Sequence, residues 1–141
     1  CLPVGETSFD LDPFSNKQNT TKSKRYFTIE DNAFSQDWDC SEGNIWINPP
    51  FSKMRKVVPK VINFVEENPY ANVMMLCKAD FRTRWSQSLL SDADGFVIIN
   101  DYIKFEGCTD SAPFSVILYY WHIKQYQLMD IVDKRFVNVR L

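Results

Sequence analysis

The chain has 141 residues, of which 45% are hydrophobic and 15% aromatic, which is typical of one globular domain and excludes a disordered segment. No apolar run approaches the about 18 residues of a membrane-spanning helix, and no signal peptide is recognisable. The formal net charge of −2 by itself argues against a dedicated nucleic-acid binder. We expect one domain over 1–141, with its core over 8–121 and a tail over 122–141 that has no clear pattern.

The cysteine pattern does not predict a metal site. The four cysteines are far apart, without a Cys-x-x-Cys pair, and His122 is the one histidine. We therefore expect no metal and a reducing, intracellular setting, with Cys77 buried at the end of an apolar segment. Because the sequence opens with Cys1 and not Met, we interpret it as a fragment of a longer protein.

Residues 8–12 alternate polar and apolar side chains, which predicts a strand that Pro13 ends. Asp10, Asp12, Pro13 and Phe14 lie along and just after it, and carboxylates at a strand end can bind the ribose hydroxyls or amino group of a nucleotide-like cofactor. The alternative is a strand end with solvated acids, and no Gly-x-Gly motif follows. The next expected elements are a polar loop over 14–23, a short strand over 25–28 and a turn over 31–38.

An apolar strand predicted over 44–47 leads into a stiff loop with two consecutive prolines. This loop, the Asn-Pro-Pro-Phe loop, consists of Asn48, Pro49, Pro50 and Phe51. The amide oxygen of Asn48 and the carbonyl of Pro49 can each accept one N–H, while Phe51 can stack on a ring. The set suits a planar group with an exocyclic amine, whose lone pair becomes nucleophilic when two acceptors pull the nitrogen toward tetrahedral geometry. The alternative is a two-proline turn without a ligand.

Aliphatic side chains recur at helical spacing from Val57 to Val65, which predicts a helix that ends at Asn68, with Pro59 in its first turn or at a kink. Two groups of basic residues lie beside predicted strand ends and suit contacts to phosphates. They are Lys53, Arg55 and Lys56 after the Asn-Pro-Pro-Phe loop, and Lys78, Arg82 and Arg84 further on. The alternative is an ordinary solvated surface.

The later patterns complete an α/β plan. They predict strands over 71–77, 95–99 and 114–121, a short helix over 83–90 and a short strand over 103–105. Strands that alternate with helices predict parallel middle strands joined by right-handed crossovers. In such a sheet ligands bind beyond the carboxyl ends of the strands, where polar residues follow at 12–13, 48–50 and 78–80. We expect the site at this edge.

Several segments, taken together, resemble the phage-type DNA N6-adenine methyltransferase family, which also occurs as methylase-like domains in prophages and mobile elements. The segments are 9–13, 25–28 with 30–31, 36–38, 45–51, 79 with 83–85, 103–107 and 112–115. The resemblance implies a Rossmann-like sheet, mostly parallel with an antiparallel C-terminal strand, that binds S-adenosylmethionine and methylates the N6 amine of adenine in DNA. It assigns Asn48, Pro49 and Phe51 to the target adenine.

The same resemblance places the cofactor beside the first predicted strand and the turn over 31–38, where a carboxylate or amide would take the adenine amino group and an apolar residue would cover its face. An Asx turn is the alternative there. The predicted cofactor contacts are Asp10, Asp12, Pro13, Phe14, Asp31, Asn32, Ala33 and Phe34. The implied setting is a bacterial or phage-infected cytoplasm, or a nucleus if the mobile element is eukaryotic.

Three features depart from the family pattern. Lys78 stands where the family often has proline, Arg82 stands where an acid commonly precedes the threonine, and the upstream Thr-Pro helix is absent. Two alternatives to DNA adenine methylation therefore stay open. One is amine methylation of RNA or protein glutamine, and the other is a catalytically inactive methyltransferase-like domain that serves binding or assembly in a mobile-element protein.

Overall fold

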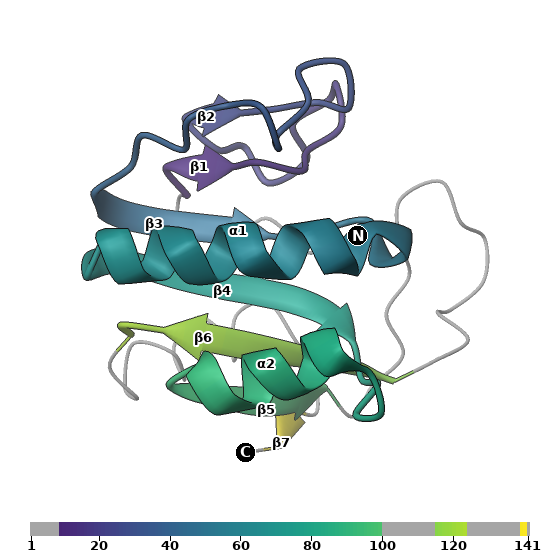
Figure 1. The fold of residues 1–141 in the computed structure, drawn as a ribbon. Helices are drawn as coiled ribbons and strands as arrows, with labels where there is room; N and C mark the ends of the chain where they lie inside the picture. Colours follow the sequence, from purple (N-terminus) through teal and green to yellow (C-terminus); the bar gives the residue numbers. More distant parts are fainter. Residues whose placement is uncertain (1–8, 100–114, 124–138, 141) are drawn as a thin grey trace.

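The computed structural model describes residues 9–99, 115–123 and 139–140, which form one mixed seven-stranded sheet with helices on one face (Figure 1). The strands are β1 (Leu11–Asp12), β2 (Arg25–Tyr26), β3 (Glu42–Ile47), β4 (Tyr70–Lys78), β5 (Gly95–Ile99), β6 (Val116–Trp121) and β7 (Val139–Arg140). The helices are α1 (Met54–Glu67) and α2 (Arg84–Asp92), and a 3₁₀ turn, η1 (Phe51–Lys53), precedes α1. The α/β fold class predicted from the sequence is confirmed.

The strand order in the sheet is β2-β1-β3-β4-β6-β5-β7. β1 pairs in parallel with β2 and β3, and β3 pairs in parallel with β4. β6 lies between β4 and β5 and runs antiparallel to both, so β5 has the same direction as β4. The carboxyl ends of β1, β3 and β4 therefore meet at one edge of the sheet, as the sequence predicts.

The first two strands are shorter than predicted, although backbone bonds continue beyond them: the N–H of Asp10 donates to the Asn44 carbonyl at 2.7 Å and that of Phe27 to the Asp12 carbonyl at 3.1 Å. The carboxylate of Asp10 also accepts the N–H of Asn44 at 2.8 Å, and the paired register of β1 with β3 is at Leu11. After β2, the N–H of Thr28 donates to the carboxylate of Asp31 at 2.8 Å and the chain leaves the sheet. The predicted strands over 8–12 and 25–28 are correct in place and too long.

α1 buries the apolar stripe that its sequence predicts, including four valines. Because the helix begins at Met54, Pro59 lies in its second turn, which excludes the first turn, one of the two predicted placements. Proline has no N–H for the carbonyl four residues earlier, and Pro59 lies on the exposed side of α1, where water can bond that carbonyl. The helix ends at Asn68 as predicted, with the backbone N–H and the side-chain amide of Asn68 both donating to the Phe64 carbonyl.

α2 begins one residue later than predicted, because Thr83 is its N-cap. The Thr83 hydroxyl accepts the N–H of Ser86 at 3.3 Å, which satisfies one of the free donors at the helix start. The helix continues to Asp92, two residues beyond the predicted end. Leu89 is fully buried and anchors α2 on the sheet.

The central strands are buried on both faces, as their unbroken apolar runs predict. Ile45 and Ile47 belong to the cluster that includes the buried side chains of α1 and α2, whereas Trp46 packs in a second cluster on the opposite face. Trp46 is in ring contact with Phe9 at 5.5 Å between centroids. Cys77 is buried with a free thiol, as predicted.

Some predicted segments lie outside the described residues, namely 100–114 and most of the tail over 122–141. Within the ranges that the structure describes, no helix is long and apolar enough to cross a membrane. A search of the same ranges for three or more clustered His, Cys, Asp or Glu side chains finds no group that could hold a metal ion.

Candidate functional site

The Asn-Pro-Pro-Phe loop follows β3 directly, in the middle of the parallel part of the sheet. Pairing with β4 stops where the loop begins, because Pro49 and Pro50 have no N–H for the ladder. Pro50 is extended, with φ −65° and ψ 122°, and its carbonyl accepts the N–H of Lys53 at 3.0 Å. The loop is therefore held between the end of a buried strand and the start of η1.

The residues of the loop differ in their exposure. Pro49 is buried, whereas Asn48 and Phe51 are half-buried, with Phe51 packed against the cluster that α1 and α2 cover. Among the described residues no hydrogen-bond partner is found for the Asn48 side-chain amide. An incoming amine can therefore use this acceptor without displacing a partner from the described part of the chain.

Asp12 lies at the carboxyl end of β1, but it is only 4% exposed. Its Oδ2 accepts the hydroxyl of Thr21 at 2.7 Å, its Oδ1 accepts the N–H of Phe14 at 3.3 Å, and the Thr21 hydroxyl lies 2.8 Å from that of Ser23. Burial raises the pKa of Asp12 to about 6, although the hydrogen bonds from Thr21 and Phe14 lower it. Asp12 thus fastens the polar loop that follows β1. Sequence reasoning missed Thr21 and Ser23, because hydroxyls in a polar loop have no periodic signal.

Asp10 lies on the amino side of β1 and has partners of its own. Besides accepting the N–H of Asn44, its carboxylate lies 3.2 Å from the Lys24 ammonium. These contacts join β1 to the neighbouring chain segments. The cofactor contact at Asp10 stays a prediction.

Two of the predicted cofactor segments meet beyond the carboxyl ends of β1 and β2. The ring of Phe14 lies 5.7 Å from that of Phe34 and 5.9 Å from that of Trp38, between centroids. Asp31 is exposed and lies three residues before Phe34 in the sequence. Its Oδ2 accepts the N–H and the hydroxyl of Thr28 at 2.8 and 3.1 Å. The structure therefore brings Phe14 together with the 31–34 turn, as the resemblance predicts.

The 31–34 turn has the Asx geometry that the sequence left open as an alternative. Asn32 has a positive φ of 58°, and its Oδ1 accepts the N–H of Phe34 at 3.2 Å. Ala33 is buried, and its carbonyl accepts the indole N–H of Trp38 at 3.0 Å. These bonds order the turn and leave Phe34 half-buried.

The predicted phosphate contacts are all exposed, and they fall into two groups near the same edge. Lys53, Arg55 and Lys56 lie on η1 and the first turn of α1, whereas Lys78, Arg82 and Arg84 surround the segment between β4 and α2. Figure 1 shows the start of α1 and the start of α2 on the same side of the molecule. The two groups can therefore face one ligand from this side.

One predicted phosphate contact also touches a predicted cofactor residue. The Lys56 ammonium lies 5.9 Å from the centroid of the Phe34 ring, and that of Lys60 lies 5.2 Å from the Trp38 ring. These four side chains line an open groove of about 540 Å³ along α1. Lys60 belongs to the basic residues that follow the Asn-Pro-Pro-Phe loop in the sequence, but it is not among the predicted phosphate contacts. The sequence signal for these contacts is a shared spacing: Phe34 and Trp38 are four residues apart, and so are Lys56 and Lys60.

The fold and the site together define an α/β protein that presents an amide, a carbonyl and an aromatic ring at the carboxyl edge of its sheet. Residues 4–118 match the family described as DNA N-6-adenine-methyltransferase (Dam), and the chain belongs to this family, which confirms the resemblance. A protein of Escherichia phage T1 named DNA N-6-adenine-methyltransferase is 31% identical over 77 residues. The aligned part covers 55% of this chain and 31% of the phage protein, so the chain spans less than two thirds of that relative's length.

Proposed function

We propose that the chain transfers a methyl group from S-adenosylmethionine to the exocyclic N6 amine of adenine in DNA. The observation that carries this proposal is the Asn-Pro-Pro-Phe loop at the carboxyl end of a central parallel strand, in a chain of the DNA N-6-adenine-methyltransferase family. A parallel sheet with an antiparallel strand inserted beside β5 is compatible with a Rossmann-like methyltransferase. The name of the phage T1 relative favours DNA over RNA or protein glutamine.

The loop would act by holding the amine in a reactive geometry. Asn48 Oδ1 and the Pro49 carbonyl each accept one hydrogen of N6, which localises the nitrogen lone pair and favours the transition state over the flat ground state. S-adenosylmethionine, when bound, supplies an electrophilic methyl group on a sulfonium. The methyl group would move to N6 as the S–C bond breaks, S-adenosylhomocysteine would be the leaving group, and the proton lost from N6 would pass to water.

Phe51 would stabilise an adenine that has left the duplex. Extruding a base from a duplex costs roughly a few kcal/mol. Stacking on an aromatic side chain is worth about 1–3 kcal/mol and offsets part of that cost. Phe51 is half-buried and packs against the core cluster that α1 and α2 cover, which fixes the position of its ring at this edge.

The residues beyond β1 and β2 fit an adenosine-like cofactor in their chemistry. Asp31 is exposed, and no described residue donates to its Oδ1, so this oxygen can accept a hydroxyl or an amino group. Phe14 and Phe34 offer an apolar surface beside it. Asp12 is buried and already bonded, so we assign it the positioning of the loop after β1 and assign direct contacts to Asp31, Phe14 and Phe34.

The test is transfer of a labelled methyl group from S-adenosylmethionine to duplex DNA, RNA and protein substrates. We expect labelled DNA with the wild-type chain, no labelling with Asn48→Ala, and wild-type labelling with Asn63→Ala, an exposed asparagine on α1 that serves as the matched control. Both variants should unfold at the wild-type urea concentration. Wild-type transfer by Asn48→Ala would overturn the assigned role. Labelling of RNA or protein alone would support the other amine substrates, and DNA binding without cofactor binding in calorimetry would support the non-catalytic domain.

A further inference from the structure

The segment between β4 and α2 carries an aromatic ring that has no role in the reaction proposed above. Phe81 is 46% exposed. It lies three residues beyond Lys78, the end of β4, and β4 pairs directly with the strand that carries the Asn-Pro-Pro-Phe loop. The N–H of Ala79 donates to the carbonyl of Ser115 at 2.9 Å, which ties the start of this segment to the residue before β6. Phe81 therefore lies at the edge of the sheet where the proposed site is.

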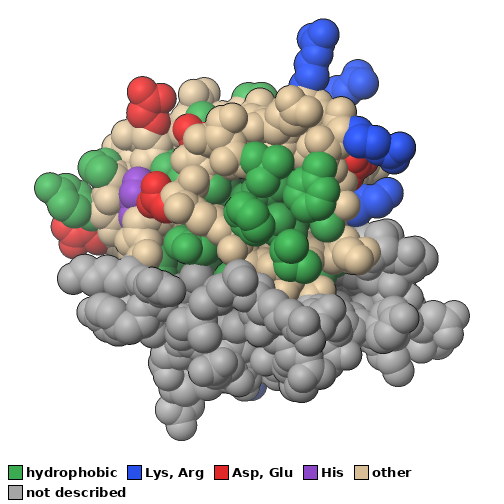
Figure 2. All heavy atoms as spheres, turned by 90° about the horizontal axis from the view of Figure 1, so that it is seen from below, with side chains coloured by type: hydrophobic (Ala, Val, Ile, Leu, Met, Phe, Trp, Pro, Cys, Tyr) green, Lys and Arg blue, Asp and Glu red, His purple; other side chains and the backbone are tan. Residues whose placement is uncertain are grey.

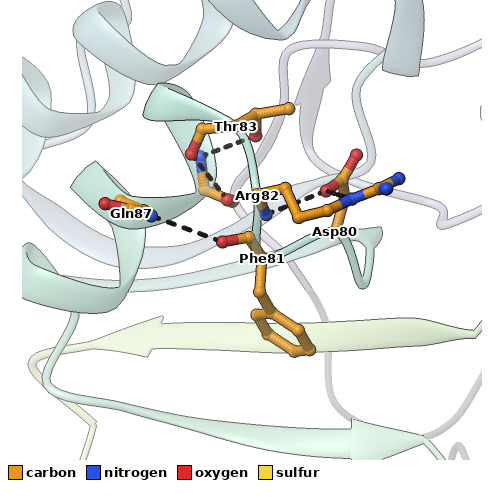
Figure 3. Close-up of polar contacts among 6 residues, drawn as sticks. Asp80, Phe81, Arg82, Thr83 and Gln87 are labelled. Carbon is orange, nitrogen blue, oxygen red and sulfur yellow. Dashed lines mark hydrogen bonds and ion pairs between the residues drawn. The ribbon is translucent and has the colours of Figure 1, made fainter.

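Hydrogen bonds on both sides of Phe81 hold its backbone in place (Figure 3). The Asp80 carboxylate accepts the N–H of Arg82 at 3.0 Å, which makes an Asx turn around Phe81. The carbonyl of Phe81 accepts the side-chain amide of Gln87 at 3.5 Å, and Thr83 caps α2 directly afterwards. The exposed ring is thus attached to an ordered backbone, which lowers the entropy lost when it binds a partner.

Exposed basic side chains flank Phe81 in the sequence. Lys78, Arg82 and Arg84 are all exposed, and the Arg82 side chain, 3.9 Å from Asp80, is 94% exposed. Figure 2 shows Lys and Arg side chains gathered at one side of a hydrophobic patch. In Figure 3 the ring of Phe81 points away from the guanidinium of Arg82. A DNA strand has phosphates on one side and bases on the other, and this segment separates cations from an aromatic ring in the same way.

We propose that Phe81 stacks on a DNA base beside the target adenine, while Lys78, Arg82 and Arg84 contact phosphates of the same strand. The proposal rests on the proposed function, because it requires DNA at this edge of the sheet. When a base leaves the duplex, its neighbours lose a stacking partner, and a ring on an ordered segment replaces that partner. Phe81 would therefore stabilise the opened duplex without touching the reacting amine.

The test is the affinity for a fluorescent adenine-containing duplex, measured by anisotropy over a series of salt concentrations. We expect Phe81→Ala to weaken binding about tenfold, within the range known for base–aromatic stacking. Its salt dependence should match the wild type, because no phosphate contact is lost, whereas Arg82→Ala should lower the slope by about 1. Phe81→Trp should retain binding. The matched control is Phe96→Ala, since Phe96 is 43% exposed but lies on β5 beside Tyr119, at 6.3 Å between ring centroids.

The possible outcomes separate this inference from the proposed function. Unchanged DNA affinity of Phe81→Ala, together with loss of transfer in Asn48→Ala, would overturn the role of Phe81 and leave the proposed function standing. A wild-type chain that neither binds nor methylates DNA would overturn both. If Phe81→Ala changes the sedimentation behaviour of the protein and not its DNA affinity, the ring belongs to a contact between copies of the chain, and the stacking role is wrong.

Discussion

Replacing Asp12 with asparagine should stabilise the fold at neutral pH and remove one component of its pH dependence. Asp12 is 4% exposed, and burial raises its pKa from 3.8 to about 6. An acid with a folded-state pKa above its unfolded-state value binds a proton more readily in the folded protein. Its contribution to stability is therefore complete below pH 3.8 and is lost as the pH rises through about 6.

The size of this effect follows from the two pKa values. The difference between 3.8 and about 6 corresponds to about 3 kcal/mol of unfolding free energy, at about 1.4 kcal/mol per pKa unit. The Asp12→Asn side chain keeps an oxygen that can accept the Thr21 hydroxyl, but it loses the stronger bonds of a charged acceptor. We therefore expect a net gain of about 1–3 kcal/mol at neutral pH.

The measurement is urea unfolding of the wild type and of Asp12→Asn from about pH 4 to about pH 7, because the expected change falls in that interval. Subtracting one free energy from the other cancels the titration of groups that the substitution leaves alone. The stability of the variant relative to the wild type should rise with pH. Asn63→Ala, at an exposed side chain that does not titrate, is the control and should show no such rise. If the difference in unfolding free energy between the two proteins stays constant with pH, the reasoning that burial raises the pKa of Asp12 is wrong.

Three further variants test the fold and the basic surface. Gly43→Ala should destabilise the protein, because Gly43 has φ +148° and an added Cβ would lie 2.5 Å from the Asp10 carboxylate. Thermal unfolding should show a lowered Tm, and an unchanged Tm would contradict this reasoning. Leu89→Ala should lower the free energy of unfolding in urea by about 2–5 kcal/mol, since Leu89 is the fully buried leucine of α2. A loss below about 1 kcal/mol would mean that the packing of α2 does not depend on this side chain. Combined alanine replacement of the exposed basic group on η1 and α1 should reduce the salt slope of DNA binding by up to about 3, and an unchanged slope would exclude phosphate contacts there. That group is Lys53, Arg55 and Lys56.

The sequence was most informative where structure depends on neighbours along the chain. The spacing of aliphatic side chains predicts α1, because burial of one helix face needs only that periodicity. The strand β5 has the predicted bounds, and the strand before the Asn-Pro-Pro-Phe loop ends where the prolines remove ladder donors. The bounds of β1 and β2 were predicted too long, and at both places aspartate side chains, those of Asp10 and Asp31, bond backbone N–H groups, which the alternation of residue types does not reveal.

By itself, the sequence determined the α/β class, the family and the loop suited to an exocyclic amine, because each is encoded in residue types at short spacing. Only the tertiary structure decided that Asp12 is buried against Thr21, that Lys56 lies over Phe34 and that Phe81 is exposed on an ordered segment among basic side chains. Hydrogen-bond partners, burial and pKa depend on which distant residues the fold brings together. For this reason the Asn-Pro-Pro-Phe loop could be predicted from residues 48–51, whereas the surroundings of the predicted cofactor residues required the folded chain.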